Sequence, residues 1–170
     1  MESTYDPETH SLKLANVTPD TMASVEWPAG LETLIVAGDY LDTLVIPEGV
    51  DFVSCESLGL RNIVVPDSLL SLYCARNCLR SLELPSGLER LDASHNCLYD
   101  LSFRPPGPVA LFCLDLEDVK LPSLDLKVNP DCSIVLGRVK HNMTLSAEVK
   151  FAIKNEPVLL AKRGSETIKE

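Results

Sequence analysis

Residues 28–103 consist of four consecutive segments of nineteen residues, each of which begins with proline. They read PAGLETLIVAGDYLDTLVI (28–46), PEGVDFVSCESLGLRNIVV (47–65), PDSLLSLYCARNCLRSLEL (66–84) and PSGLERLDASHNCLYDLSF (85–103). Apolar residues recur at the same offsets in all four segments. A repeat of this length cannot bury its apolar face alone, so we expect successive segments to stack into a solenoid.

Counted from the first apolar residue after each proline, the segments share the pattern L-x-x-L-x-[V/C/A]-x-x-N-x-L-x-x-L-x-[L/I/V/F]-P. The alternation at the fourth and sixth positions predicts a short strand with both apolar residues facing inward. Successive strands should pair side by side in a parallel sheet. The rest of each segment is too short for a full helix and predicts a return in extended, polyproline or 3₁₀ conformation.

The same offsets extend the series in both directions. Upstream, Leu12, Ala15 and Val17 fit the first, fourth and sixth positions. Downstream, a segment that begins at Pro108 fits every apolar position after an insertion over residues 104–107. We therefore expect a terminal cap on each side of the repeats, because an open solenoid end exposes its core. The expected organisation is a tail or cap over 1–8, six repeats over 9–127, a non-repeat cap over 128–164 and a frayed tail over 165–170.

The predicted C-terminal cap contains two short apolar runs. Residues 133–136 and 157–160 are predicted strands. Residues 143–153 fit either a pair of strands or a short helix. The sequence leaves these alternatives open.

Asparagine stands at the ninth position of two segments, as Asn77 and Asn96. Its amide can bond to backbone groups where the chain turns out of the strand, and stacked copies would form a ladder. The corresponding residues of the other units are Asp20, Asp39, Leu58 and Val119. Since aspartate approximates asparagine, we expect the ladder to be weakest at Leu58 and Val119.

This pattern resembles that of leucine-rich repeats. The short, proline-cornered form is most similar to the bacterial type found in secreted effectors of pathogens. The resemblance implies a leucine-rich-repeat solenoid with a curved parallel β-sheet on its concave side and extended or 3₁₀ returns. It also implies that the chain binds another protein.

Composition excludes several classes of partner. The chain is 45% apolar but only 5% aromatic, which predicts an aliphatic core. A net charge of −10 disfavours nucleic acid and anionic membrane surfaces, which need clustered Lys and Arg. The first residues lack the features of a signal peptide, and no apolar run is long enough to span a membrane. We expect a cytoplasmic or intracellular protein, in a host cell if it is an effector or a viral protein.

Two pairs of cysteines recur one repeat apart. Cys55 and Cys74 share the inward-facing sixth position and are expected to act as small apolar residues. Cys78 and Cys97 share the tenth position, a spacing compatible with a disulfide or with part of a metal site. A reducing compartment favours free thiols.

Catalytic motifs are missing from the sequence. Asp92, Ser94 and His95 have the residue types of a triad, but neighbouring residues on a strand point to opposite faces, so we expect no convergence. No glycine-rich phosphate loop, nucleophile elbow or metal-ligand cluster occurs. We expect no enzymatic activity, no cofactor and no metal.

The concave face is the expected binding surface. Its exposed positions are the third, fifth, seventh and eighth, which include Leu14, Ser71, Ala75 and Ser94. Aromatic residues and arginine are frequent at binding hot spots, and they gather in the middle of this face. The candidate partner-binding residues are Phe52, Tyr73, Arg76, Arg90, Asp92, His95 and Asp115. The alternative function is that of a structural or scaffold component in a larger assembly, such as a virion or an effector complex.

Overall fold

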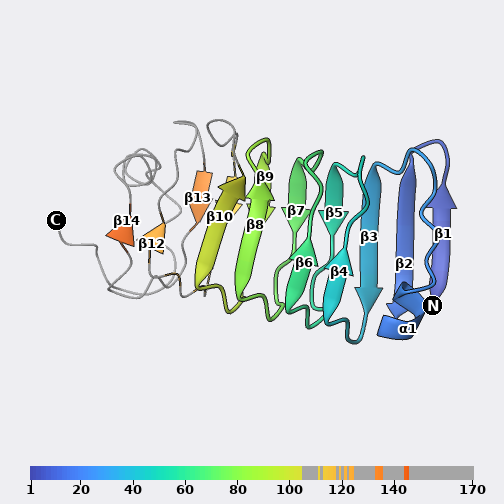
Figure 1. Cartoon of the computed structure of the whole chain (residues 1–170), viewed down its shortest axis with the longest axis horizontal. Helices are drawn as coiled ribbons and strands as arrows, with labels where there is room; N and C mark the ends of the chain where they lie inside the picture. The colour runs from blue at the N-terminus through green and yellow to red at the C-terminus, as the bar shows by residue number, and fades with distance from the viewer. Residues whose placement is uncertain are drawn as a thin grey trace.

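A computed structural model shows that the chain forms a β-solenoid of stacked parallel strands about nineteen residues apart. The described residues are 1–104, 111, 113–117, 119, 121, 123–124, 133–135 and 144–145. The strands follow one another along a single elongated stack, with the N-terminus at one end (Figure 1). Almost none of the described chain is helical. The prediction of a repeat solenoid with a parallel sheet is confirmed.

One ladder of the solenoid is an eight-stranded sheet. Its strands in spatial order are β1 (Glu2–Asp6), β2 (Ser11–Val17), β3 (Thr33–Gly38), β5 (Phe52–Ser54), β7 (Ser71–Tyr73), β9 (Arg90–Asp92), β11 (Cys113–Asp115) and β13 (Ser133–Val135). β1 pairs antiparallel with β2, and every later pair is parallel. We call this sheet the long sheet.

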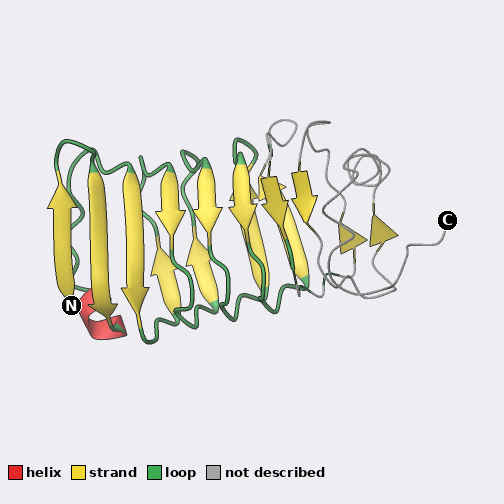
Figure 2. Ribbon diagram, turned by 180° about the vertical axis from the view of Figure 1, so that it is seen from behind, coloured by secondary structure: helices red, strands yellow, loops and turns green. Residues whose placement is uncertain are grey.

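The returns between these strands are extended. They form three two-stranded parallel sheets, made of β4 (Thr43–Val45) with β6 (Asn62–Val64), β8 (Ser81–Pro85) with β10 (Asp100–Arg104), and β12 (Ser123–Leu124) with β14 (Thr144–Leu145). Figures 1 and 2 show these return strands and the long sheet from opposite sides. The one helix in the described part of the chain is the four-residue α1 (Pro19–Met22), and the returns described contain no 3₁₀ helix.

The register follows the proline period. Thr33, Phe52, Ser71 and Arg90 are successive partners across β3, β5, β7 and β9, each nineteen residues from the last. The next partner, Cys113, comes twenty-three residues after Arg90, so the insertion is absorbed between two paired strands.

Strands also occur within the predicted C-terminal cap. β13 coincides with the predicted strand at 133–136 and pairs with β11, while β14 lies in the ambiguous segment 143–153 and pairs with β12. Both ladders therefore continue past residue 127. The predicted strand at 157–160 and the tail at 165–170 lie outside the described residues.

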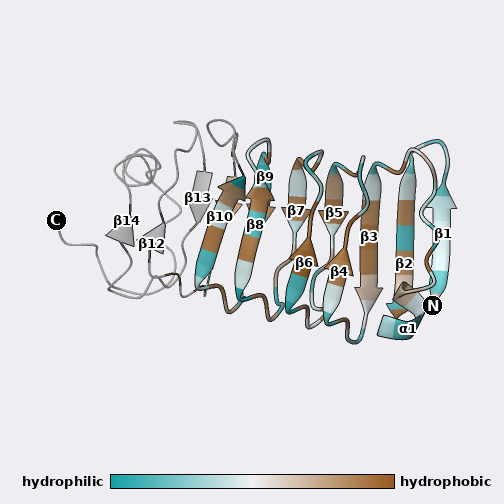
Figure 3. Cartoon of the chain, viewed as in Figure 1, coloured by the Kyte–Doolittle hydropathy of each residue, from teal (hydrophilic) through white to brown (hydrophobic). Residues whose placement is uncertain are grey.

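The core consists of the inward side chains of both ladders. In the long sheet, Leu34, Val53, Leu72, Leu91 and Leu114 form one column, and each is at most 1% exposed. The return strands add a facing column that includes Leu44, Leu82 and Leu84, and both columns belong to one buried cluster. Figure 3 shows these apolar stretches recurring from strand to strand.

The first repeat has a different register from the one predicted. Leu12 pairs with Leu34, and Leu14 with Val36, so β2 precedes β3 by twenty-two residues rather than nineteen. Leu14 is 1% exposed, and its prediction as an exposed residue is wrong. The register then shifts at a bulge, where Asn16 has a left-handed φ of 54°.

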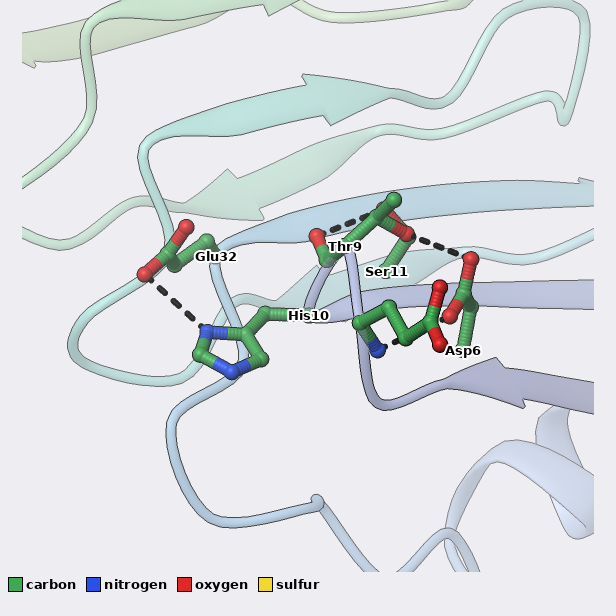
Figure 4. Close-up of polar contacts among 6 residues, drawn as sticks. Asp6, Thr9, His10, Ser11 and Glu32 are labelled. Atoms are coloured by element: carbon green, nitrogen blue, oxygen red, sulfur yellow. Dashed lines mark hydrogen bonds and ion pairs between the residues drawn. The ribbon is translucent and has the colours of Figure 1, made fainter.

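The N-terminal end is closed by the β1–β2 hairpin. Its turn is held by Asp6, which accepts hydrogen bonds from the Glu8 backbone at 2.9 Å and the Thr9 hydroxyl at 2.8 Å (Figure 4). The hydrogen bond from the Thr9 hydroxyl is the main cause that lowers the pKa of Asp6, and the bond from the Glu8 amide lowers it further. His10 Nδ1 lies 3.1 Å from Glu32 Oε1, which joins the hairpin to the residue before β3.

The expected asparagine ladder is present at Asn77 and Asn96, both 5% exposed. Asn77 Oδ1 accepts from the amides of Leu58 and Leu60, each at 3.0 Å, in the preceding coil. Its Nδ2 donates to Cys55 O at 2.9 Å in that coil, and to two carbonyls of its own coil. The Leu58 turn is thus stabilised from the next coil rather than weakened.

The aspartates predicted to approximate the ladder do not take part in it. Asp20 lies in α1, and both Asp20 and Asp39 are exposed. A carboxylate cannot donate to the turn carbonyls as the asparagine amide does, so burial there would leave a charge and unpaired acceptors. The coils that contain Asp20 and Asp39 therefore turn without a buried ladder side chain.

We expect Asn77→Ala to lower the free energy of unfolding by about 2–4 kcal/mol, because it leaves buried donors and an acceptor of the neighbouring coil unpaired. Urea unfolding measures the change. Asn62→Ala, at an exposed asparagine of β6, is the matched control and should change stability by less than about 0.5 kcal/mol. Equal unfolding midpoints for the two variants would contradict the role given to the buried amide.

A second expectation concerns Gly38, which pairs with Val17 at the bulge. A Cβ at Gly38 would lie 2.6 Å from Val17 O and 2.9 Å from Val17 N. Gly38→Ala should therefore destabilise the chain by about 1–3 kcal/mol in thermal unfolding. Gly87→Ala is the control, since a Cβ there meets no atom within 4 Å. Equal melting temperatures for the two variants would show that the close approach of β2 and β3 at Gly38 does not limit the stability of the chain.

Candidate functional site

The outer face of the long sheet presents two rows of side chains, one on each side of the buried central column. One row contains Thr33, Phe52, Ser71, Arg90 and Cys113, which are partners on successive strands. The other contains Ile35, Ser54, Tyr73, Asp92 and Asp115 in the same relation. Strand alternation places both rows on the side opposite the core. Five of the seven candidate residues lie in these rows.

Phe52 and Tyr73 contact each other diagonally across β5 and β7. Their ring centroids are 5.5 Å apart with an interplanar angle of 38°, a tilted arrangement within the favourable range for aromatic pairs. The residue opposite each ring is a serine, since Ser71 pairs with Phe52 and Ser54 with Tyr73. Both aromatic residues are partly exposed, so one apolar patch stands on the sheet between small polar residues.

One arginine stands beside this patch on the next strand, and another follows Tyr73 at the corner after β7. Arg90 is next to Ser71 in the first row, its side chain is 53% exposed, and its Nη1 lies 3.9 Å from Glu89 Oε2. Arg76 is exposed at the corner after β7, where its φ is 57°. At that distance the contact with Glu89 is a weak surface ion pair, so the Arg90 guanidinium retains donors for another group.

The far end of the face is acidic. Asp92 and Asp115 are direct partners on β9 and β11. Each Oδ1 accepts from the backbone amide two residues later, which is Ser94 for Asp92 at 3.0 Å and Glu117 for Asp115 at 2.9 Å. These bonds fix both carboxylates at the point where their strands end.

Burial raises the pKa of Asp115 above its ordinary value. The neighbouring charges of Asp92 and Glu117 raise it further, while the Glu117 amide and His95 act in the opposite direction. Partial burial disfavours the charged form of a carboxyl group, and like charges add to that effect.

Ser94 and Asp92 contact each other just after β9 ends. Ser94 Oγ donates to Asp92 Oδ1 at 2.7 Å, and the Ser94 amide donates to the same oxygen at 3.0 Å. The single hydroxyl proton is therefore engaged by the carboxylate. In a triad the serine proton goes to an imidazole and the carboxylate orients that imidazole, so this contact is not a triad contact.

His95 is exposed at the corner after β9, with a left-handed φ of 54°. Its amide donates to Glu117 O at 2.6 Å. Arg76 and Ser57 have similar left-handed φ values, 57° and 58°, at the equivalent corners one and two coils earlier. This column of left-handed corners was not predicted from the sequence, although it stands at a regular position, the eighth position of each repeat.

Several residues predicted to be exposed on this face are buried. Besides Leu14, they are Ser71 at 7%, Ala75 at 5% and Ser94 at 7% exposed. All three have small side chains. The accessible surface is therefore formed by the aromatic rings, the arginines and the acidic residues.

No disulfide joins the four cysteines at the repeated positions of the central coils. Cys55 and Cys74 are buried as predicted, whereas Cys78 and Cys97 are exposed. Within the described residues, no group of three or more His, Cys, Asp or Glu side chains is placed to hold a metal ion. No helix in this part of the chain has the length and apolarity needed to cross a membrane.

Comparison with known proteins adds no relative. No protein-family model matches the chain, and no curated protein and no solved structure matches it either.

We expect Asp115→Asn to raise the melting temperature slightly at neutral pH. The asparagine Oδ1 still accepts from the Glu117 amide, while the charge that folding disfavours is removed. Because the folded-state pKa of Asp115 is raised, wild type loses this penalty as pH falls through that pKa. The advantage of the variant, at most about 0.5 kcal/mol for a partly solvated group, should vanish toward pH ~4.

Thermal melts between neutral and acidic pH measure this effect. Asp100→Asn removes the same charge from an exposed position on β10 and serves as the control. An advantage of Asp115→Asn that grows as the pH falls would contradict the assigned direction of the pKa shift.

Proposed function

We propose that this chain is a non-enzymatic binding module that captures another protein across the outer face of the long sheet. The observation that supports this most directly is the contact between Phe52 and Tyr73 on that face. An aromatic pair of this kind is usually buried, and the chain contains few aromatic residues to place anywhere. Its position on the outer face favours a partner that completes its burial.

The charges around the pair define the partner's chemistry. Arg90 stands beside the aromatic patch, and Asp92 and Asp115 follow it along the stack. Arg76 is exposed at the corner after Tyr73. A complementary surface would present an apolar or aromatic side chain between an acidic and a basic group. Aromatic and arginine anchors surrounded by polar residues are typical of protein–protein hot spots.

The pattern of the repeats supports the same proposal. The resemblance to leucine-rich repeats implies a protein-binding role for the strand face, which would be the concave side. The resemblance to secreted pathogen effectors would make the partner a host protein. The regular β-solenoid, with its nineteen-residue spacing, is consistent with such a repeat.

A second candidate function is that of a structural component in a larger assembly, bound through the opposite side. Val45 and Val64 are direct partners on β4 and β6 and are 58% and 54% exposed. Two adjacent apolar side chains on the return strands favour contact there. In this case the partner would be recovered in fixed stoichiometry rather than captured reversibly.

We expect the double variant Tyr73→Ala with Arg90→Ala to weaken partner binding at least tenfold, since two central hot-spot residues are truncated. The immobilised wild-type chain is used to capture proteins, and a captured candidate is then purified and titrated against each variant. Thermal unfolding of the variant checks that the fold is retained. Both side chains lie on the outer face, so the effect on stability should be small.

The matched control is Val45→Thr with Val64→Thr on the opposite side. It should leave the affinity unchanged if the outer face of the long sheet binds the partner. Loss of binding in this control, with retention in the Tyr73 and Arg90 variant, would replace the first function with the second.

A further inference from the structure

We propose that Cys78 and Cys97 form a reversible disulfide across two adjacent coils. The two thiols occupy the tenth position of successive nineteen-residue repeats, directly after Asn77 and Asn96. They lie at one corner of the solenoid, outside the strand rows that form the candidate binding face. The inference is therefore independent of the proposed function.

Backbone hydrogen bonds bring the two residues together. The Cys97 amide donates to Leu79 O at 3.0 Å, and the Leu79 amide donates to Asn96 Oδ1 at 3.0 Å. Both polar groups of the residue after Cys78 are thus held by Cys97 and its neighbour. Neither cysteine lies in a strand, but chains in a parallel stack are spaced about 4.8 Å apart, which falls within the Cα separation that disulfides require.

The side chains leave the solenoid on the same side. Each cysteine stands between two buried residues, Asn77 and Leu79 in one coil and Asn96 and Leu98 in the next. Alternation therefore directs both thiols away from the core, and both are exposed. The two turns are built by the same asparagine contacts, so the thiols leave equivalent positions of adjacent coils.

The buried pair Cys55 and Cys74 provides an internal comparison. It has the same nineteen-residue spacing, but burial raises the pKa of Cys55 to about 12 and that of Cys74 well above its ordinary value. The thiolate is the reactive species in disulfide exchange, and these two thiols are shielded from any oxidant. Because the two pairs share the same spacing but differ in exposure, we expect Cys78 and Cys97 to react and Cys55 and Cys74 to remain inert.

The oxidant would be a small-molecule disulfide such as oxidised glutathione. One protein thiolate attacks it, forms a mixed disulfide and releases one glutathione thiolate. The second protein thiolate then attacks the protein sulfur of the mixed disulfide and releases the other glutathione. The protein loses two electrons and two protons, which reduce the oxidant to two thiols.

Oxidation would link the coils over residues 66–84 and 85–103. The bridge closes a loop over residues 78–97 and restricts the unfolded chain, so the oxidised protein should unfold at a higher temperature than the reduced one. The linked coils already share Asn96, which donates to Cys74 O across them. The disulfide would therefore cross-link two coils that are already joined by this hydrogen bond.

The test treats the purified full chain with excess oxidised glutathione, blocks remaining thiols with an alkylating reagent and maps peptides by mass spectrometry. We expect a cross-link between residues 78 and 97 within one chain, with Cys55 and Cys74 fully alkylated once the chain is denatured. Dithiothreitol should reverse it completely. Cys113→Ser is the control and should retain the cross-link.

Cys78→Ser and Cys97→Ser should each abolish the cross-link and leave the remaining thiol as a mixed disulfide with glutathione. If either variant fails to fold, the peptide map of the oxidised wild-type chain tests the proposal by itself. Only mixed disulfides in wild type, a link to any other cysteine, or a link between two chains would overturn the proposal.

Discussion

The buried asparagine amide is the interaction on which the stacking of the central coils depends. A coil that turns sharply after three strand residues leaves amides and carbonyls that neither ladder can pair. Asn77 satisfies such groups in two coils at once, through Leu58, Leu60 and Cys55 of one and Cys74 and Ala75 of the other. One side chain therefore fixes both the shape of a turn and the distance to its neighbour.

That constraint explains why the outer face can vary while the interior does not. The inward column of Leu34, Val53, Leu72 and Leu91 changes little in size, since each residue fills the same space between the two ladders. The outward neighbours range from serine to phenylalanine and arginine along the same strands. A solenoid thus separates the residues that build the stack from those that define its surface.

The sequence predicted the central coils well because each expected contact is local or one repeat away. The inward column, the parallel pairing of successive strands and the asparagine ladder at Asn77 and Asn96 all follow from a fixed period. The first repeat could not be assigned this way, because α1 and the bulge at Asn16 change its length by three residues while its apolar spacing still fits the template. A template of apolar positions alone does not detect such a shift.

The candidate site was predicted at the level of rows but not of individual contacts. Asp92 and Ser94 were both expected on the exposed face, but the hydrogen bond that joins them at 2.7 Å was not predicted. Exposure was also overestimated for Ser71 and Ala75, because it depends on neighbouring side-chain size as well as direction.

The left-handed corners at Ser57, Arg76 and His95 were not predicted either, because they depend on backbone conformation rather than on side-chain direction or size. A non-glycine residue accepts that conformation only where the following contacts enforce it, and here the buried ladder does so. The corners that display Arg76 and His95 therefore depend on the same amides that hold the stack together.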